Sequence, residues 1–335
     1  MKPTDFARYL SAFLGSHLPA VRNVSSNTIH SYRDTYRLLL VYCAGNLGIK
    51  IEHLSLVELT EDRVLGFLDW VQQERKCGIA TRNQRLAAIH ALFRYIQTEA
   101  PENLARSQKI LAIPLKKSPK PTVHYLSPVA VRQILEQPDR NTAEGRRDLS
   151  ILGLLYDTGA RVQELADLTV RDVRLDKPPI ITLTGKGRKT RHVPLMTNTA
   201  ALITRYMQEN DLFHKGQDSC LFVNRQGAKF NRAGIAYILE KYASRARSVS
   251  AGIPEGITPH VLRHSKAMHL FQSGVPLVYI RDLLGHADIG TTEIYARADT
   301  EMKRKALESA YPEMNSIALP DWNLDHGLLD WLNQL

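Results

Sequence analysis

The segment IPLKKSPKPT, residues 113–122, limits what this chain can fold into more than any other stretch. It contains Pro114, Pro119 and Pro121 together with three lysines. Proline lacks a backbone N–H donor and fixes φ, so the segment resists both helix and strand. We therefore expect an extended basic linker between two domains. Two domains also suit a chain of 335 residues, because one hydrophobic core rarely serves that length.

The residues before the linker show helical periodicity. Two segments, residues 25–44 and 80–100, place their apolar side chains three or four positions apart, on one face of a helix. These side chains are Ile29, Tyr32, Tyr36, Leu39 and Cys43 in the first segment, and Leu86, Ile89, Phe93 and Ile96 in the second. The pattern predicts a small all-helical domain over residues 1–112.

Arg82 and Arg85 fall off the apolar face of the second segment. Taken alone, they indicate a solvated helix face as readily as a DNA-binding one. The charge favours DNA, because residues 1–120 hold 17 Lys and Arg residues against 10 Asp and Glu residues. Residues 121–310 carry a further net charge of +7, whereas residues 311–335 hold four acids and no Lys or Arg. Two large basic segments are expected of a protein that lies along a phosphate backbone.

After the linker, local signals indicate helices and one hairpin. Ser127 predicts a helix start, and Gly159 predicts the left-handed end of another helix. Residues 178–195 have the pattern of a strand, a glycine-bearing turn and a strand, with Lys186 at the tip. The rest of residues 123–312 has a mostly helical pattern. The expected fold is mainly α with a small antiparallel β-sheet.

The cysteines and the N-terminus indicate a cytoplasmic protein. Cys43, Cys77 and Cys220 form no CxxC or zinc-binding pattern, so we expect ordinary buried thiols in a reducing compartment. The N-terminus lacks an apolar signal region, and no run of about 18 apolar residues could span a membrane.

Four stretches place charged or nucleophilic residues where packing does not require them. They are TGARVQEL, TGKGRKTR, TPHVLRHS and LLGHADIGTTEIYAR, and the residues concerned are Arg161, Lys186, His260, Arg263, His286 and Tyr295. In this order and spacing they resemble the tyrosine recombinase (lambda-type phage integrase) family, which includes Cre-like and Xer-like enzymes. The resemblance covers nearly the whole chain. It implies a helical core-binding domain followed by a mixed α/β catalytic domain.

The chemistry of these residues suits an attack on DNA. A phosphodiester under attack spreads negative charge over its non-bridging oxygens, and stabilising that charge is the main catalytic task. Arginine presents a planar fork to phosphate, so we assign Arg161 and Arg263 to clamp it. Tyrosine, with a pKa of about 10, needs such a charged neighbourhood to attack. The resemblance implies that Tyr295 forms a 3′-phosphotyrosine link and frees a 5′-hydroxyl.

The hairpin turn is the expected source of a proton for the leaving 5′-oxygen. The family places a general-acid lysine at this turn, and Lys186 is the matching residue. The nearby Arg188, Lys189 and Arg191 are candidates for DNA-phosphate contacts.

Two histidines and one acid complete the expected site. His260 and His286 can hydrogen-bond the phosphate or handle a proton near neutral pH. Glu164 matches a supporting acid of the family that holds Arg161 or a histidine in place. The other histidines of this region are expected to be structural: His192, His214, His264 and His269.

Neither a nucleotide loop nor a metal site is expected. A P-loop needs a glycine where Ile180 stands and a Ser or Thr where Gly187 stands. His260 and His264 form only half of a zinc pattern, without an HExxH glutamate or a nearby cysteine. A phosphotyrosine ester conserves bond energy, and arginines replace a cation, so we expect no cofactor.

The expected partner is double-stranded DNA with paired recombination sites. The C-terminal tail, residues 313–335, contains Trp322, Leu328, Leu329 and Trp331. Family members often donate such a tail to a neighbouring protomer, so we expect a homo-tetramer on two DNA duplexes. Companion recombinases are further expected partners. Docking of the tail onto its own domain is the alternative.

The leading function is recombination by a mobile element, because the residues after Arg263 resemble transposon-encoded recombinases most. An Xer-like enzyme that resolves chromosome dimers is one alternative. A DNA-binding relative without activity and a relaxing type IB topoisomerase are others. The sequence leaves open whether Lys266 faces DNA.

Overall fold

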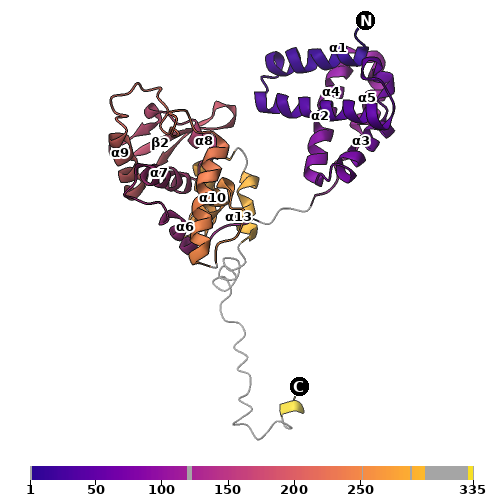
Figure 1. Cartoon of the computed structure of the whole chain (residues 1–335). Coiled ribbons are helices and arrows are strands. Elements are labelled where there is room, and N and C mark those ends of the chain that lie inside the picture. Colours follow the sequence, from indigo (N-terminus) through magenta and orange to yellow (C-terminus); the bar gives the residue numbers. More distant parts are fainter. Residues whose placement is uncertain (1, 119–122, 251, 287–288, 299–330, 335) are drawn as a thin grey trace. The chain divides into compact units, whose positions relative to one another are not determined.

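The computed structural model describes residues 2–118, 123–250, 252–286, 289–298 and 331–334. The chain divides into two compact units, Met1–Pro121 and Thr122–Leu335 (Figure 1). Each unit has its own hydrophobic core. The fold is mainly α with one three-stranded antiparallel sheet, which confirms the predicted fold class. Most of the predicted tail, residues 313–335, lies outside the described residues. In the part of the chain that is described, no helix is both long and apolar enough to cross a membrane.

The first unit is all-helical. Its elements are α1 (Asp5–Ala12), the π-helix η1 (Phe13–Val21), α2 (Ser26–Asn46), the short 3-10 turns η2 (Ile51–His53) and η3 (Leu56–Glu58), α3 (Glu61–Gln73), α4 (Ile79–Glu99), η4 (Pro101–Asn103) and α5 (Leu104–Leu111). Both predicted helices are present as α2 and α4. The Ser25 hydroxyl caps α2 by accepting from the backbone N–H of Thr28.

The predicted placement of Arg82 on an open helix face is wrong. Arg82 is only 2% exposed, and its Nε has no hydrogen-bond partner within the described residues. Burial lowers its pKa. Arg85 is half-buried and donates to the Ser31 carbonyl at 3.2 Å and the Thr35 hydroxyl at 3.0 Å, which ties α4 to α2. The burial of Arg82 argues against a direct contact between this residue and DNA.

The segment after α5 returns to the start of α4, which helical periodicity could not reveal. Asn83 and Lys116 exchange two hydrogen bonds, at 2.8 and 3.1 Å between the side-chain amide and the backbone. The Lys116 ammonium also donates to Gln72 at 2.6 Å, and Ile113 is buried in the core. The first residues of the expected linker therefore pack on the helical unit.

The second unit surrounds a small sheet with helices. Its elements are α6 (Pro128–Leu135), α7 (Ala143–Thr158), α8 (Val162–Ala166), η5 (Val170–Asp172), β1 (Val173–Arg174), β2 (Ile180–Thr184), η6 (Lys186–Arg188), β3 (Thr190–Pro194), α9 (Thr197–Glu209), α10 (Arg232–Val249), α11 (Pro259–Gln272), α12 (Leu277–Leu284), η7 (Ile289–Thr291) and α13 (Glu293–Ala298). The predicted hairpin is β2 and β3, with Ile181 opposite Val193. The short strand β1, which pairs with β2, was not predicted.

Helix α7 lies at the centre of this unit and packs against both α9 and α11. Its apolar side chains point in several directions and are buried, as expected of a helix that is covered on all sides. It ends at Gly159, which adopts φ 57° and ψ 27°, as predicted. This left-handed turn sets the direction of the chain that leads to Arg161.

Gly159→Ala should destabilise the second unit more than an alanine at another left-handed glycine. A Cβ at Gly159 would lie 2.8 Å from Leu284 Cδ2, whereas a Cβ at Gly227 would meet nothing within 4 Å. We expect Gly227→Ala to lower the free energy of unfolding by about 1 kcal/mol, through backbone strain alone. Gly159→Ala should lower it by about 3 kcal/mol, because overpacking is added. Urea unfolding followed by circular dichroism measures both; equal losses would show that Leu284 yields freely.

Candidate active site

A single carboxylate organises the charges at the start of α8. Glu164 Oε2 accepts from the backbone N–H of Arg161 at 2.8 Å, and Oε1 accepts from the Arg161 guanidinium at 2.7 Å. Another nitrogen of Arg161 donates to the carbonyl of Gly285 at 3.1 Å. Arg161 therefore links the start of α8 to the end of α12. The expectation that Glu164 holds Arg161 agrees with this geometry.

Arg191 on β3 is the second partner of Glu164. Its terminal nitrogens donate to Oε1 and Oε2 at 3.0 and 2.7 Å, and its Nε donates to the Leu283 carbonyl at 2.7 Å. Burial by itself would raise the pKa of Glu164, but the hydrogen bonds from Arg191 and Arg161 outweigh it and lower the pKa to about 2. The Glu164 carboxylate is therefore ionised at neutral pH.

These bonds leave Arg191 less available to DNA than an unpaired surface arginine. Each guanidinium nitrogen has a protein partner, and the side chain is 11% exposed. The residue's position beside Lys189 in the sequence could not show that β3 faces α8.

Arg263 on α11 also links the turn before α8 to the end of α12, but from the buried side. It is 3% exposed and donates to the carbonyl of Gly159 at 2.5 Å and that of Leu284 at 2.6 Å. Burial, followed by the positive charge of Arg161, lowers its pKa to about 10. The guanidinium stays protonated at neutral pH, and a nearby anion would relieve the repulsion between the two arginines.

The two histidines of the predicted site are both shifted toward the neutral form. His286 is hydrogen-bonded through Nδ1 to the Thr292 hydroxyl at 2.9 Å, and its pKa falls to about 4 through burial and the charges of Arg263 and Arg161. His260 is exposed at the start of α11. Desolvation by its neighbours and the same two arginines lower its pKa.

A pocket of about 530 Å³ opens beside these groups. Its lining includes Arg161, Lys189, Arg191, Arg281 and His286. Asp282 is the acid of the lining, and it pairs with Arg281 at 2.8 Å. The excess of cationic side chains suits an anion such as a DNA phosphate.

The hairpin turn borders this pocket. Lys186 begins η6, between Gly185 and Lys189, and these two neighbours line the pocket. Arg188 and Lys189 are exposed, so both remain candidates for phosphate contacts.

The predicted nucleophile lies outside the pocket lining. Tyr295 on α13 is fully buried and packs in one cluster with Met268 and Leu284. Its hydroxyl is 2.9 Å from Nδ1 of His264. Burial raises the pKa of Tyr295 to about 12, although the charge of Arg263 acts in the opposite direction. The expectation that His264 is purely structural missed this contact.

Sequence reasoning could have found His264 but not Arg281. His264 follows Arg263 directly and lies one helical turn after His260, which was considered only as half of a zinc pattern. Arg281 stands in a helix that carries no motif of its own, and only the tertiary fold brings it to the pocket.

The position left open by the sequence, Lys266, contacts protein. Its ammonium lies 3.4 Å from Asp157 and 5.1 Å from the centre of the Tyr156 ring. These contacts join α11 to α7 and explain why a lysine is tolerated there.

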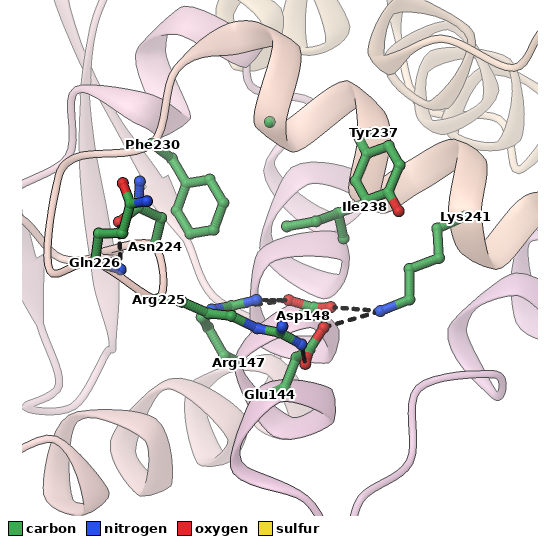
Figure 2. Close-up of a pocket in the computed structure, with 11 residues that line it drawn as sticks. Glu144, Arg147, Asp148, Asn224, Arg225, Gln226, Phe230, Tyr237, Ile238 and Lys241 are labelled. Carbon is green, nitrogen blue, oxygen red and sulfur yellow. Dashed lines mark hydrogen bonds and ion pairs between the residues drawn. The ribbon is translucent and has the colours of Figure 1, made fainter.

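A second pocket, of about 440 Å³, lies between α7, α10 and the turn at residues 224–226 (Figure 2). Figure 2 shows its two acids, each paired with a base: Glu144 with Arg225 and Lys241, and Asp148 with Arg147. Arg225 and Lys241 lower the pKa of Glu144 to about 2. These ion pairs hold α10 against the start of α7.

The fold agrees with comparisons to known families. Residues 124–302 match the phage integrase family, and residues 10–100 match the phage integrase N-terminal SAM-like domain. The chain therefore belongs to the phage integrase family and is a tyrosine recombinase, as its motifs predict.

Individual relatives include both integrases and Xer enzymes. A putative integrase/recombinase, y4rC, of Sinorhizobium fredii is 35% identical over 338 residues, covering 100% of this chain and 99% of that protein. Tyrosine recombinase XerC of Roseiflexus castenholzii is 33% identical, covering 87% of this chain and 89% of that protein. The crystal structure of XerH bound to its difH substrate is similar with a TM-score of 0.66 and 25% identity, covering 90% of this chain and 85% of that chain.

Glu164→Gln should remove a pH-dependent part of the stability. The pKa of Glu164 is about 2 in the fold against an ordinary 4.5, so its stabilisation is complete above pH 4.5 and is lost as the pH falls to 2. The difference corresponds to about 3 kcal/mol. Denaturant unfolding between pH 2 and 6 should show a smaller pH dependence in Glu164→Gln than in wild type.

Glu144→Gln is the matched control, because the pKa of Glu144 is also about 2 but its ion pairs lie in the second pocket. It should change the acid stability and spare DNA cleavage, whereas Glu164→Gln should impair both. Full cleavage by Glu164→Gln would contradict the role assigned to this carboxylate.

Proposed function

We propose that the protein is a site-specific recombinase of a mobile element, which cuts and rejoins DNA by attack of Tyr295 on a phosphodiester. The observation that carries the proposal is that Arg161 and His286 line one pocket. Beside them Arg263 donates to the Leu284 carbonyl, and Tyr295 packs in the same cluster as Leu284. Arg263 connects the pocket to the nucleophile, because its charge acts on both His286 and Tyr295.

The two arginines supply the charge that the reaction needs. Arg161 and Arg263 repel each other, and a phosphodiester between them would be attracted by both. As the non-bridging oxygens gain negative charge during attack, this attraction increases, which lowers the barrier. His286, neutral at pH 7, donates or accepts a hydrogen bond to the phosphate without adding a further cation.

The attack requires a rearrangement of α13. Tyr295 has no exposed surface, so its hydroxyl reaches a phosphate only after the helix shifts. We infer that DNA binding drives this shift, because a phosphate at the arginines offers a favourable interaction that the free protein lacks. Lys186, in the turn that borders the pocket, then protonates the leaving 5′-oxygen.

Metal ions and nucleotides are not required in this scheme. The arginines provide the positive charge that a divalent cation supplies in other phosphoryl-transfer enzymes. The phosphotyrosine ester retains the energy of the broken backbone bond, so rejoining needs no nucleotide.

Two biological settings have support. One relative that matches the whole chain is a putative integrase/recombinase, which favours a mobile element. Similarity to XerC supports chromosome dimer resolution as the second candidate. The DNA used in the test below separates them.

Wild-type protein should form a covalent adduct with nicked, labelled DNA in the presence of EDTA, visible on a denaturing gel. Tyr295→Phe should form none, because phenylalanine lacks the attacking oxygen. Tyr279→Phe is a matched control, since Tyr279 is an exposed tyrosine on α12. Adducts with DNA from the ends of the host element, and none with a chromosomal dimer-resolution site, are expected; the reverse preference favours an Xer role. An adduct that persists in Tyr295→Phe would contradict the assigned nucleophile.

We also propose that residues 313–335 dock on a neighbouring protomer in a tetramer on two duplexes. Deletion of residues 315–335 should then reduce the amount of paired-duplex complex in a native gel at least tenfold, while binding to a single site changes little. Unchanged pairing would favour docking of the tail onto its own domain.

A further inference from the structure

One contact in the site has no role in the scheme above. The hydroxyl of Tyr295 lies 2.9 Å from Nδ1 of His264, and the two rings have centroids 5.8 Å apart. Tyr295 is fully buried, and His264 is half-buried. The contact joins α11 to α13 at the atom that must become the nucleophile.

The phenol needs a proton acceptor within hydrogen-bond reach when it attacks, so His264 has to remain its partner as α13 shifts. Burial opposes formation of a phenolate, and the pKa of Tyr295 of about 12 leaves the hydroxyl protonated at neutral pH. A hydroxyl attacking phosphorus must lose its proton during the step, and transfer to a group within hydrogen-bond reach is the direct route.

His264 has the right charge state to receive that proton. Burial, His260 and Arg263 all lower its pKa, so the imidazole is neutral at pH 7. A neutral imidazole has one nitrogen with a free lone pair, and Nδ1 accepts when the proton is on Nε2. The charged or titratable groups facing His264 are Tyr295 on α13, His260 and Arg263 on α11, and His286 after α12.

We propose that His264 is a catalytic base of the cleavage step and accepts the phenolic proton of Tyr295 through Nδ1. The inference rests on the proposed nucleophilic role of Tyr295. In the step, the Tyr295 O–H bond breaks and its oxygen bonds to phosphorus. The bond from phosphorus to the 5′-oxygen breaks, and the leaving oxygen takes a proton from Lys186. His264 becomes an imidazolium, and it returns the proton to the phenolate when the strand is rejoined.

The same helix contains a matched contact away from the site. His269 Nδ1 lies 2.7 Å from the hydroxyl of Tyr156, and His269 Nε2 lies 2.8 Å from the Leu126 carbonyl. Loss of His269 therefore removes a histidine–tyrosine hydrogen bond of similar geometry from α11. It removes no group that touches the reacting atoms.

The test measures single-turnover adduct formation on two nicked substrates of the same sequence. One has a normal 5′-oxygen at the cleaved bond and the other a 5′-bridging sulfur, whose thiolate leaves without a proton. His264→Gln can keep a hydrogen bond to the phenol but cannot take up a proton. We expect His264→Gln to slow the reaction about 100-fold or more on both substrates. Lys186→Ala should be slow on the oxygen substrate and recover on the sulfur substrate, and His269→Gln should retain the wild-type rate on both.

Other results would overturn the inference. A rate for His264→Gln within a fewfold of wild type would reduce His264 to a packing role, as would an equal loss in His269→Gln. Recovery of His264→Gln on the sulfur substrate would move its action to the leaving group. A loss on both substrates in His260→Gln but not in His264→Gln would identify His260 as the base. If wild type forms no adduct on either substrate although it binds both, the proposed nucleophile fails and this inference fails with it.

Discussion

The buried carboxylate of Glu164 is the interaction on which the arrangement of the site depends. Through its two oxygens it fixes Arg161 at the start of α8 and Arg191 on β3. These arginines in turn hold the backbone carbonyls of Gly285 and Leu283 at the end of α12. One negative charge thus joins a helix start, a strand and a helix end that are far apart in the sequence. Since Glu164 also offsets part of the positive charge, several cations can lie close together in a partly buried site without a bound anion.

The remaining cations favour an anion, and the partner that we propose for them is a DNA phosphate. Arg263 is buried with backbone carbonyls for partners, and its pKa is depressed by burial and by Arg161. Burial, together with the charge of Arg263, lowers the pKa of His286 and of His264, which preserves their ability to accept hydrogen bonds. In the proposed scheme the arginines therefore have two effects, because they attract the substrate and also favour the neutral imidazoles that can receive protons.

Sequence reasoning predicted most of the fold and the membership of the family. The period of apolar residues gave α2 and α4, and Gly159 marked the end of α7, because these signals depend on neighbouring residues. It failed where distant segments meet. The burial of Arg82 depends on packing that its own helix does not encode, and the partners of Arg191 come from α8 and the end of α12. His264 was underestimated for a different reason: the residue was visible beside Arg263, but its distance from Tyr295 depends on how α13 packs on α11. The roles of the six motif residues rest on the resemblance and on the proposed chemistry.

The burial of Tyr295 also affects the protein while no DNA is bound. An activated phenol at an open phosphate site would attack any diester or free phosphate ester that diffused in, and it would be open to nitration, iodination or phosphorylation. With its hydroxyl buried against His264 of α11, the side chain is protected from such side reactions in the resting protein. Reactivity of this one tyrosine toward a small aqueous reagent is therefore a direct measure of how often the resting enzyme opens.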